Sequence, residues 1–397
     1  MFRNILVMLD NSDYSMWAVD RSIDFAKTFG GKLVGAHVYA AKLHEQRFVQ
    51  MEPGLPAEYQ EPAKLQEQRD IHGELIEKGL KIISDSYLDV FNAKCREGGI
   101  DCDGKTMEGR NYAELVKDIS TSEYDLVAMG AKGLGEVPTT QIGSVCERVT
   151  RRINVDSLVM KAPMQLKGGH VVVGIDGSEQ SFAAMRAAIA MGKHLGARLT
   201  AITVFDPDFH YKAFDSIAKV LSEEAGKLFR FEQQEKLHNE IIDSGLEKIY
   251  RDHLEQALEM ARQEGVEVEP VVLAGKPYDM ILRWLDGKEV ALLLLGKIGV
   301  HGEDELDIGS NSENLLRNAR CNVMLVSRKV KPGGNGAGKL EEEEPMDWDA
   351  EAVELLERVP GFVRNMVRGH MEAQARKVGA SRITAQMMIE ARGKMGM

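Results

Sequence analysis

Two glycine-rich loops are the stretches of this sequence whose residue types and spacing most clearly indicate chemistry. The first reads Gly-Ala-Lys-Gly from Gly130 to Gly133, follows an apolar run, and is separated by nine residues from Gly143-Ser144. A strand that ends in such a loop brings bare backbone amides and the N-terminus of the next helix to one place, and that combination attracts phosphate. A single loop of this kind is also a common strand-to-helix turn, so it does not establish a phosphate site alone.

The same loop occurs a second time. Gly296 to Gly299 follows another apolar run, and nine further residues lead to Gly309-Ser310, so each position lies 166 residues after its counterpart. A constant offset indicates an internal duplication of one domain. Three further pairs share the offset: Asp10 and Asp176, Val38 and Val204, and Gly109 and Gly275.

The elements that must position these loops alternate between apolar strands and amphipathic helices. The first copy begins with a strand at Asn4–Leu9, has a long helix from about Ala63 to Arg96, and repeats its order of elements from His170 to Ser327. This alternation predicts an α/β fold with two tandem parallel-sheet domains, each covered by helices on both faces. The last strand of each copy, at residues 157–160 and 322–326, is apolar. Because an exposed apolar edge is a liability, we predict that the two copies pair there as a pseudo-dimer within the chain.

In an open parallel sheet, ligands bind outside the carboxyl ends of the strands. Asp10 ends the first strand, Val38 lies near the end of the second, Gly109 follows the third, and the glycine loop follows the fourth. All four therefore meet at one rim, where the acid can accept from a ribose hydroxyl or base amine and the loop can take phosphates. The alternative for Asp10 alone is a helix cap, and its recurrence at Asp176 argues against that alternative.

Both copies resemble universal stress protein domains of the ATP-binding type, over residues 1–164 and 168–330. The family signature is Gly-x-x-Gly, nine residues, and Gly-Ser/Thr after a strand, with an Asp after the first strand. The resemblance implies a Rossmann-like or flavodoxin-like fold, binding of ATP or AMP, and pairing through the last strand. The positions that match the family's nucleotide site in the first copy are Asp10, Val38, Gly109, Gly130, Gly133, Gly143 and Ser144. Those in the second copy are Asp176, Val204, Gly275, Gly296, Gly299, Gly309 and Ser310.

The two nine-residue loops differ in charge. The first contains one acid, Glu136, whereas the second contains four, namely Glu303, Asp304, Glu305 and Asp307. Acids beside a triphosphate are unfavourable unless Mg²⁺ bridges them. We therefore predict that the first copy binds ATP more tightly than the second, and that Mg²⁺ narrows the difference.

The C-terminal part of the chain has a different composition. Residues 331–345 are rich in glycine and glutamate and predict a flexible linker. Residues 346–397 predict three short helices, of which the first is capped by Asp347, the second spans residues 362–378 and the third is capped by Thr384. This tail resembles the small helical domain at the C-terminus of the B component of light-independent protochlorophyllide reductase, on residues that include Trp348 and Arg364. The catalytic body of that reductase has no counterpart here, so the resemblance implies a shared docking module and not the reaction.

Composition limits the partners and the location. A net charge of -12 argues against nucleic acid or an anionic membrane as the main partner, because both require basic surfaces. The four cysteines have no CxxC spacing and no histidine cluster near them, which favours reduced thiols in a cytoplasmic protein. No apolar run approaches the length of a bilayer span.

Three functions remain compatible with these residues. The first is an adenine-nucleotide-binding stress or regulatory protein that docks a protein partner through its C-terminal helices and forms homo-oligomers beyond the internal pairing. The second is an ATPase or autophosphorylating protein with Ser144 or Ser310 as acceptor, although no Walker-type lysine, kinase loop or general base is evident. The third is an adapter for tetrapyrrole or iron–sulfur redox machinery. We identify no catalytic residue and no metal ligand from the sequence.

Overall fold

A computed structural model describes residues 1–207, 243–300, 302, 308–332, 346–357, 368, 371, 375, 380 and 382–388. The chain forms two compact units, Met1–Gly333 and Gly334–Met397, each of which is described by itself. Within the described ranges, no helix has both the length and the apolar character needed to cross a membrane.

The first unit is built around one ten-stranded sheet, in the order β3-β2-β1-β4-β5-β10-β9-β6-β7-β8. All neighbouring strands within a copy are parallel, as the alternation of strands and helices predicts. The strands of the first copy are β1 (Asn4–Met8), β2 (Lys32–Tyr39), β3 (Cys102–Glu108), β4 (Leu126–Gly130) and β5 (Asp156–Met160). Those of the second copy are β6 (His170–Gly174), β7 (Arg198–Phe205), β8 (Val268–Ala274), β9 (Leu292–Gly296) and β10 (Asn322–Val326).

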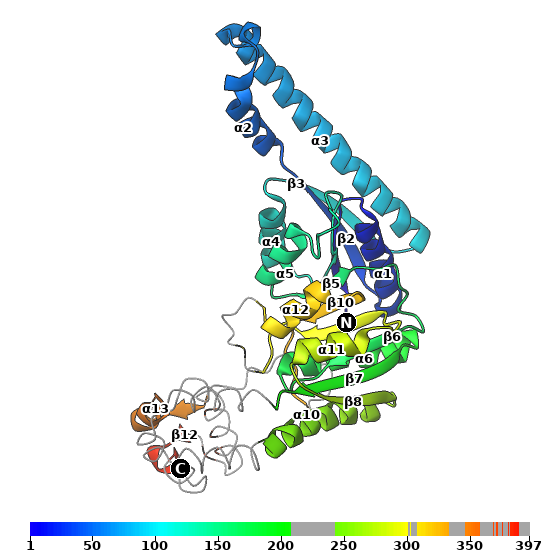
Figure 1. Cartoon of the computed structure of the whole chain (residues 1–397), viewed down its shortest axis with the longest axis vertical. Helices are drawn as coiled ribbons and strands as arrows, with labels where there is room; N and C mark the ends of the chain where they lie inside the picture. The colour runs from blue at the N-terminus through cyan, green and yellow to red at the C-terminus, as the bar shows by residue number, and fades with distance from the viewer. Residues whose placement is uncertain are drawn as a thin grey trace. The chain divides into compact units, whose positions relative to one another are not determined.

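Helices cover both faces of this sheet (Figure 1). The central strands β1, β4, β6 and β9 are almost fully buried, which explains why their sequences are continuous apolar runs and do not alternate with polar residues. The helices of the first copy are α1 (Asp13–Phe29), α2 (Ala41–Met51), α3 (Pro62–Gly98), α4 (Asn111–Thr121) and α5 (Ser144–Arg152), with 3₁₀ turns at Glu52–Gly54 and Ala57–Tyr59. The described helices of the second copy are α6 (Glu179–Leu195), α10 (Asp243–Gln263), α11 (Pro277–Leu285) and α12 (Ser310–Asn318). The predicted fold class is confirmed.

The two copies meet through their last strands, so the predicted pairing within the chain is confirmed. Strand β5 pairs with β10 in antiparallel register, with Val159 opposite Val323. The surrounding side chains repeat about a pseudo-two-fold axis: Arg151 of α5 pairs with Glu313 of α12, and Arg317 of α12 pairs with Glu147 of α5. Such reciprocal contacts are those of an isologous dimer interface, here made by one chain.

The two ends of this junction are equivalent in position but not in charge. At one end the buried carboxylate of Asp156 accepts hydrogen bonds from the backbone amide of Ser327 at 2.9 Å and from Nε of Arg328 at 2.7 Å. At the other end the side-chain oxygen of Asn322 accepts from the amides of Lys161 at 2.8 Å and Ala162 at 3.0 Å. Burial raises the pKa of Asp156 despite the neighbouring Arg328 guanidinium.

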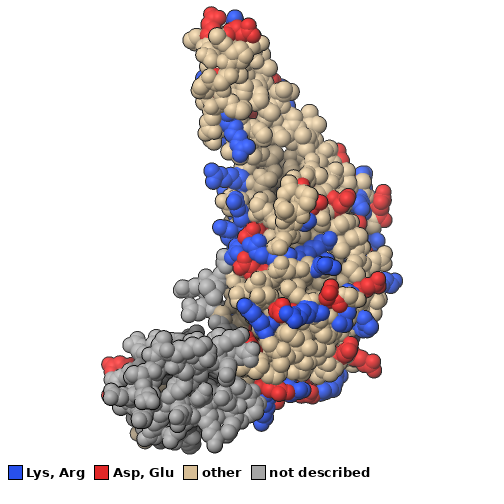
Figure 2. All heavy atoms as spheres, viewed as in Figure 1, with Lys and Arg blue, Asp and Glu red and all other residues tan. Residues whose placement is uncertain are grey.

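Helices α2 and α3 extend beyond the sheet edge formed by β3 (Figure 1). The sequence predicts the long helix α3 but not the shorter α2. Three side chains on the outer face of α3 are large, apolar and more than half exposed, namely Ile71, Leu75 and Ile82. The visible face of this region carries few charged side chains below its tip (Figure 2).

The second unit is small. Helix α13 (Ala350–Glu357) begins after Asp349, whose Oδ1 accepts from the amide of Ala352 at 2.8 Å, so the predicted cap at Asp347 is wrong. Asp347 instead belongs to strand β11 (Asp347–Trp348), which pairs in parallel with β12 (Arg382–Ile383). Thr384 accepts from the amide of Met387 at 3.4 Å, in agreement with its predicted capping role. The predicted helix over residues 362–378 lies largely outside the described residues.

Candidate functional site

A cavity of about 530 Å³ lies at the carboxyl ends of the strands in the first copy. Its volume is within the range of pockets that hold small-molecule ligands. It opens where β1, β2 and β4 end and where α4 and α5 begin, which is the rim that the sequence indicates. Six of the seven candidate residues of this copy line it: Asp10, Val38, Gly130, Gly133, Gly143 and Ser144.

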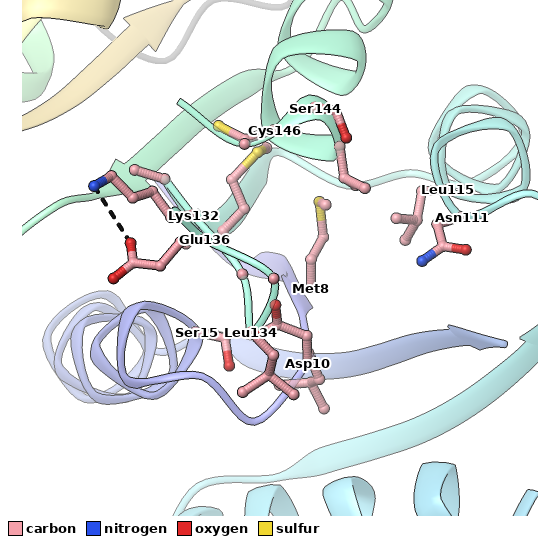
Figure 3. A pocket seen from close by; sticks show the side chains of 18 of the residues that line it. Met8, Asp10, Ser15, Asn111, Leu115, Lys132, Leu134, Glu136, Ser144 and Cys146 are labelled. Atoms are coloured by element: carbon pink, nitrogen blue, oxygen red, sulfur yellow. Dashed lines mark ion pairs between the residues drawn. The ribbon is translucent and has the colours of Figure 1, made fainter. Parts of the chain in front are cut away.

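Asp10 is held in one orientation by the turn that follows β1. Its Oδ1 accepts from the backbone amide of Ser12 at 3.0 Å and from the Ser12 hydroxyl at 2.6 Å. Ser12, and not Asp10, is the N-cap of α1, because its side-chain oxygen accepts from the amide of Ser15. The second carboxylate oxygen therefore points toward the glycine loop (Figure 3). A Cβ atom built on Gly133 would lie only 2.5 Å from that oxygen, so the approach of the loop to Asp10 requires glycine there.

The opposite wall of the cavity is the start of α5. Gly143 is the N-cap residue of this helix and has no side chain with which to occupy the first amides. Its own amide donates to the carbonyl of Ala131 at 2.7 Å, which ties the end of the nine-residue loop to its beginning. The first turn of α5, starting at Ser144, thus presents backbone donors and the positive end of the helix dipole to the cavity.

Lys132 contributes the positive charge of the first glycine loop. Its ammonium pairs with Glu136 at 3.3 Å (Figure 3) and lies 5.8 Å from the centre of the Tyr14 ring. Both Lys132 and Glu136 line the cavity. An anion that enters the cavity therefore meets a lysine whose present partner is an exposed glutamate on the same loop.

The second copy repeats this construction around a cavity of about 240 Å³. Six of its seven candidate residues are among the described lining residues: Asp176, Val204, Gly296, Gly299, Gly309 and Ser310. Asp176 binds Ser178 as Asp10 binds Ser12, and a Cβ on Gly299 would lie 2.7 Å from its Oδ2. That same oxygen accepts from the amide of Val300 at 3.0 Å. The acidic residues of this loop, at positions 303–307, lie outside the described residues.

The lysine of the second loop has a different environment from that of the first. Lys297 takes the position of Ala131, is almost fully buried, and donates to the carbonyl oxygens of Arg151 at 3.0 Å and Ile153 at 2.7 Å. It therefore caps the C-terminus of α5 across the junction between the copies. Among the described residues that line the second cavity there is no lysine or arginine.

Gly109 and Gly275 do not line either cavity among the described residues. Both have positive φ angles, 148° and 127°, and their amides donate to Tyr39 and Phe205, each at 2.8 Å. Their place in the structure is the turn that leads from β3 into α4 and from β8 into α11. Glycine is required there by the backbone conformation, which is sufficient to explain its recurrence.

Several lining residues were not predicted from the sequence. Asn111 at the start of α4 and His37 on β2 line the first cavity, and Tyr250 on α10 lines the second. Asn111 lies two residues after Gly109, a spacing that could have indicated it. Tyr250 gave no such signal, because it lies far in sequence from every motif. Among the described residues, no group of three or more histidine, cysteine or acidic side chains is placed to hold a metal ion.

The fold and the rim geometry define a class of tandem α/β proteins with a phosphate-type loop in each half, and sequence comparison identifies the family. The universal stress protein family matches residues 1–161 and 169–327, so the chain belongs to this family. A curated relative, universal stress protein MJ0531 of Methanocaldococcus jannaschii, is 26% identical over 166 residues, which cover 41% of this chain and 83% of that protein.

The solved structure of another universal stress protein shares the fold over most of the chain. A universal stress protein from Archaeoglobus fulgidus covers 82% of this chain and 98% of its own, with a TM-score of 0.50 and 18% identity. A family member from Arabidopsis thaliana, solved with AMP bound, covers 40% of this chain and 90% of its own, with a TM-score of 0.26 and 15% identity.

The tail has a separate relationship. Residues 348–392 match the family described as proto-chlorophyllide reductase 57 kD subunit. The B component of the light-independent protochlorophyllide reductase of Chloroflexus aggregans is 44% identical over 54 residues, which cover 13% of this chain and about a tenth of that relative's length. The shared segment is thus a small module that occurs in two otherwise different proteins.

Proposed function

We propose that this protein binds ATP, together with Mg²⁺, at the rim of its first copy and acts as a nucleotide-responsive regulator. One observation carries the proposal. A cavity of ligand size brings together an oriented carboxylate, a glycine loop and the open N-terminus of α5. A helix N-terminus with free amides suits phosphate oxygens, and an aspartate whose orientation is fixed suits ribose hydroxyls or a base amine.

Two measurements test this proposal. Mass spectrometry of small molecules released from the purified protein should detect an adenine nucleotide, and calorimetry should detect ATP binding that weakens in Gly133→Ala. The added methyl group would lie 2.5 Å from Asp10 Oδ2, so the loop must move away from the carboxylate. Each lost charge-assisted hydrogen bond costs about 1.5–3 kcal/mol, which corresponds to roughly tenfold or more in affinity.

The matched control is Gly79→Ala. Gly79 lies in α3, and a Cβ there meets no atom within 4 Å. Because Gly79 is away from the cavity, Gly79→Ala should leave ATP affinity unchanged. Equal affinity of wild type and Gly133→Ala, or no ATP binding by wild type, would show that the rim is not an ATP site.

We further propose that the C-terminal helices dock a protein partner. The described part of the tail has a small buried cluster that includes Ala352, Ala375 and Ile383. The sequence of the tail also matches a segment of a larger reductase, which is typical of a small domain that occurs in different proteins. Deletion of residues 346–397 should abolish capture of the partner and leave ATP affinity and the melting of the tandem body unchanged. A large loss of ATP affinity on deletion would contradict a docking role.

A further inference from the structure

The two rim cavities differ in one feature that the duplication does not explain. The long helix that follows the second strand ends at a left-handed glycine in both copies, Gly99 after α3 and Gly265 two residues after α10, and these glycines are 166 residues apart. The helices are therefore in register, and Ser84 of α3 corresponds to Tyr250 of α10. Ser84 is buried and donates back to Leu80 of its own helix at 2.8 Å, whereas Tyr250 lines the second cavity.

Two residues near Tyr250, His253 and Gly177, hold its side chain in place. His253 of α10 contacts the Tyr250 ring edge to face, with 5.9 Å between ring centres. The His253 ring lies directly on Gly177 in the turn after Asp176, where a Cβ atom would be 2.3 Å from the imidazole. In the first copy this turn position is Asn11, which adopts a left-handed conformation with φ of 59°. Gly177 therefore makes room for the histidine that holds the tyrosine.

His253 behaves as a packing residue in this arrangement. Its Nδ1 is buried and, within the described part of the chain, has no hydrogen-bond partner. Burial lowers the pKa of the imidazole, although Asp176 and Asp252 oppose that shift, so the ring is neutral at neutral pH. The imidazole therefore packs between Gly177 and the ring of Tyr250.

We propose that Tyr250 is a plug that partly fills the second rim cavity, so that the wild-type chain has one open nucleotide site and one that its own α10 restricts. This inference rests on the proposed ATP site of the first copy. The ring of Tyr250 lines the second cavity, whereas the corresponding Ser84 does not line the first. Tyr250 is a specificity-determining residue: it decides whether the shared arrangement of Asp176 and the glycine loop is accessible to a whole nucleotide.

The test is calorimetry with ATP on full-length protein in which Gly143→Ala/Ser144→Ala disables the first site. In this background Tyr250→Ser, which installs the residue of the first copy, should strengthen ATP binding at the second site by about tenfold or more. Tyr250→Phe keeps the ring and should bind as weakly as the background protein. Gly177→Asn, which places the first copy's residue against His253, should also open the site.

The outcomes separate this inference from the proposed function. If wild type binds ATP at the first site but Tyr250→Ser gains nothing, the plug is wrong and the ATP proposal stands. A gain in Tyr250→Phe equal to that in Tyr250→Ser would also overturn it, because the hydroxyl and not the ring would then control access. If the first site binds no ATP while Tyr250→Ser creates binding at the second, the plug is supported and the assignment of the first site fails.

Discussion

The two copies of this chain share a backbone arrangement and differ in how they use charge. In both, an aspartate after the first strand meets the glycine of the loop so closely that a Cβ would lie 2.5 Å or 2.7 Å from its oxygen. In the first copy the lysine of that loop, Lys132, lines the cavity, whereas in the second copy Lys297 is buried across the junction. The first loop region carries one base and one acid, and the second carries one base and four acids.

This difference shows which parts of the duplicated domain are free to change. Lys297 caps the C-terminus of α5, and Lys161 caps the C-terminus of α12 by donating to Leu316 at 2.5 Å and Ala319 at 2.6 Å. Each copy therefore supplies one lysine to a helix end of the other, from positions that are not equivalent. In the second copy the lysine of the glycine loop serves the junction, and no lysine or arginine is among the described residues that line its cavity.

The largest expected effect concerns the junction itself. Separately expressed copies, residues 1–164 and 168–330, should each self-associate, because each would otherwise expose the apolar edge of β5 or β10. We expect analytical ultracentrifugation to give dissociation constants in the micromolar range or tighter. A micromolar constant corresponds to a binding free energy of about 8 kcal/mol in favour of association. On mixing, the pair found in the intact chain should dominate, since only that pair joins Asp156 to Arg328. Two well-behaved monomers at high concentration would refute this prediction.

A second prediction concerns the helix N-termini in the two copies. Gly143→Ala/Ser144→Ala should weaken the tighter ATP site by about thirtyfold, because the loop and first turn of α5 supply charge-assisted hydrogen bonds that are each worth about 1.5–3 kcal/mol. Gly309→Ala/Ser310→Ala is the matched change and should leave the tighter site intact. If calorimetry shows that Gly309→Ala/Ser310→Ala removes the tighter site, the second copy and not the first binds ATP more tightly.

A third prediction sharpens the electrostatic part of the comparison. Glu303→Gln/Asp304→Asn/Glu305→Gln/Asp307→Asn should strengthen ATP binding by the second copy about tenfold at low salt without Mg²⁺. At an exposed rim each like-charge contact costs only about 1 kcal/mol and is screened by salt. The gain should shrink in high salt, with Mg²⁺, or with AMP in place of ATP, because AMP carries fewer charges. A gain that is independent of salt would show that the four acids do not act through their charge.

The rim could be predicted from the sequence because its determinants are local. Asp10, Gly133 and Gly143 each follow a strand, and a parallel sheet brings all strand ends to one edge whatever the rest of the fold does. Tyr250 could not be predicted, because its place in the cavity depends on how α10 packs and on the room left by Gly177. Lys161 and Lys297 were missed for the same reason: nothing in the sequence around either lysine indicates that its side chain crosses to the other copy.

The smallest expected effect comes from making the two ends of the junction alike. Asp156→Asn installs the residue found at Asn322 and keeps an acceptor for the backbone amide of Ser327, while the side chain of Arg328 is 38% exposed. The free energy of unfolding in urea should therefore fall by less at neutral pH than it does in Asp156→Ala. Asp156→Ala is the contrasting change and should cost about 1–3 kcal/mol, because it leaves buried donors without a partner.

Burial raises the pKa of Asp156, so the folded protein takes up this proton at a higher pH than the unfolded chain does. Stability of wild type relative to Asp156→Asn should accordingly rise as pH falls from neutrality through the raised pKa, by at most about 1.4 kcal/mol per pH unit. Equal losses in the Asn and Ala variants would show instead that the charge on Asp156, and not its hydrogen bonds, holds this end of the junction.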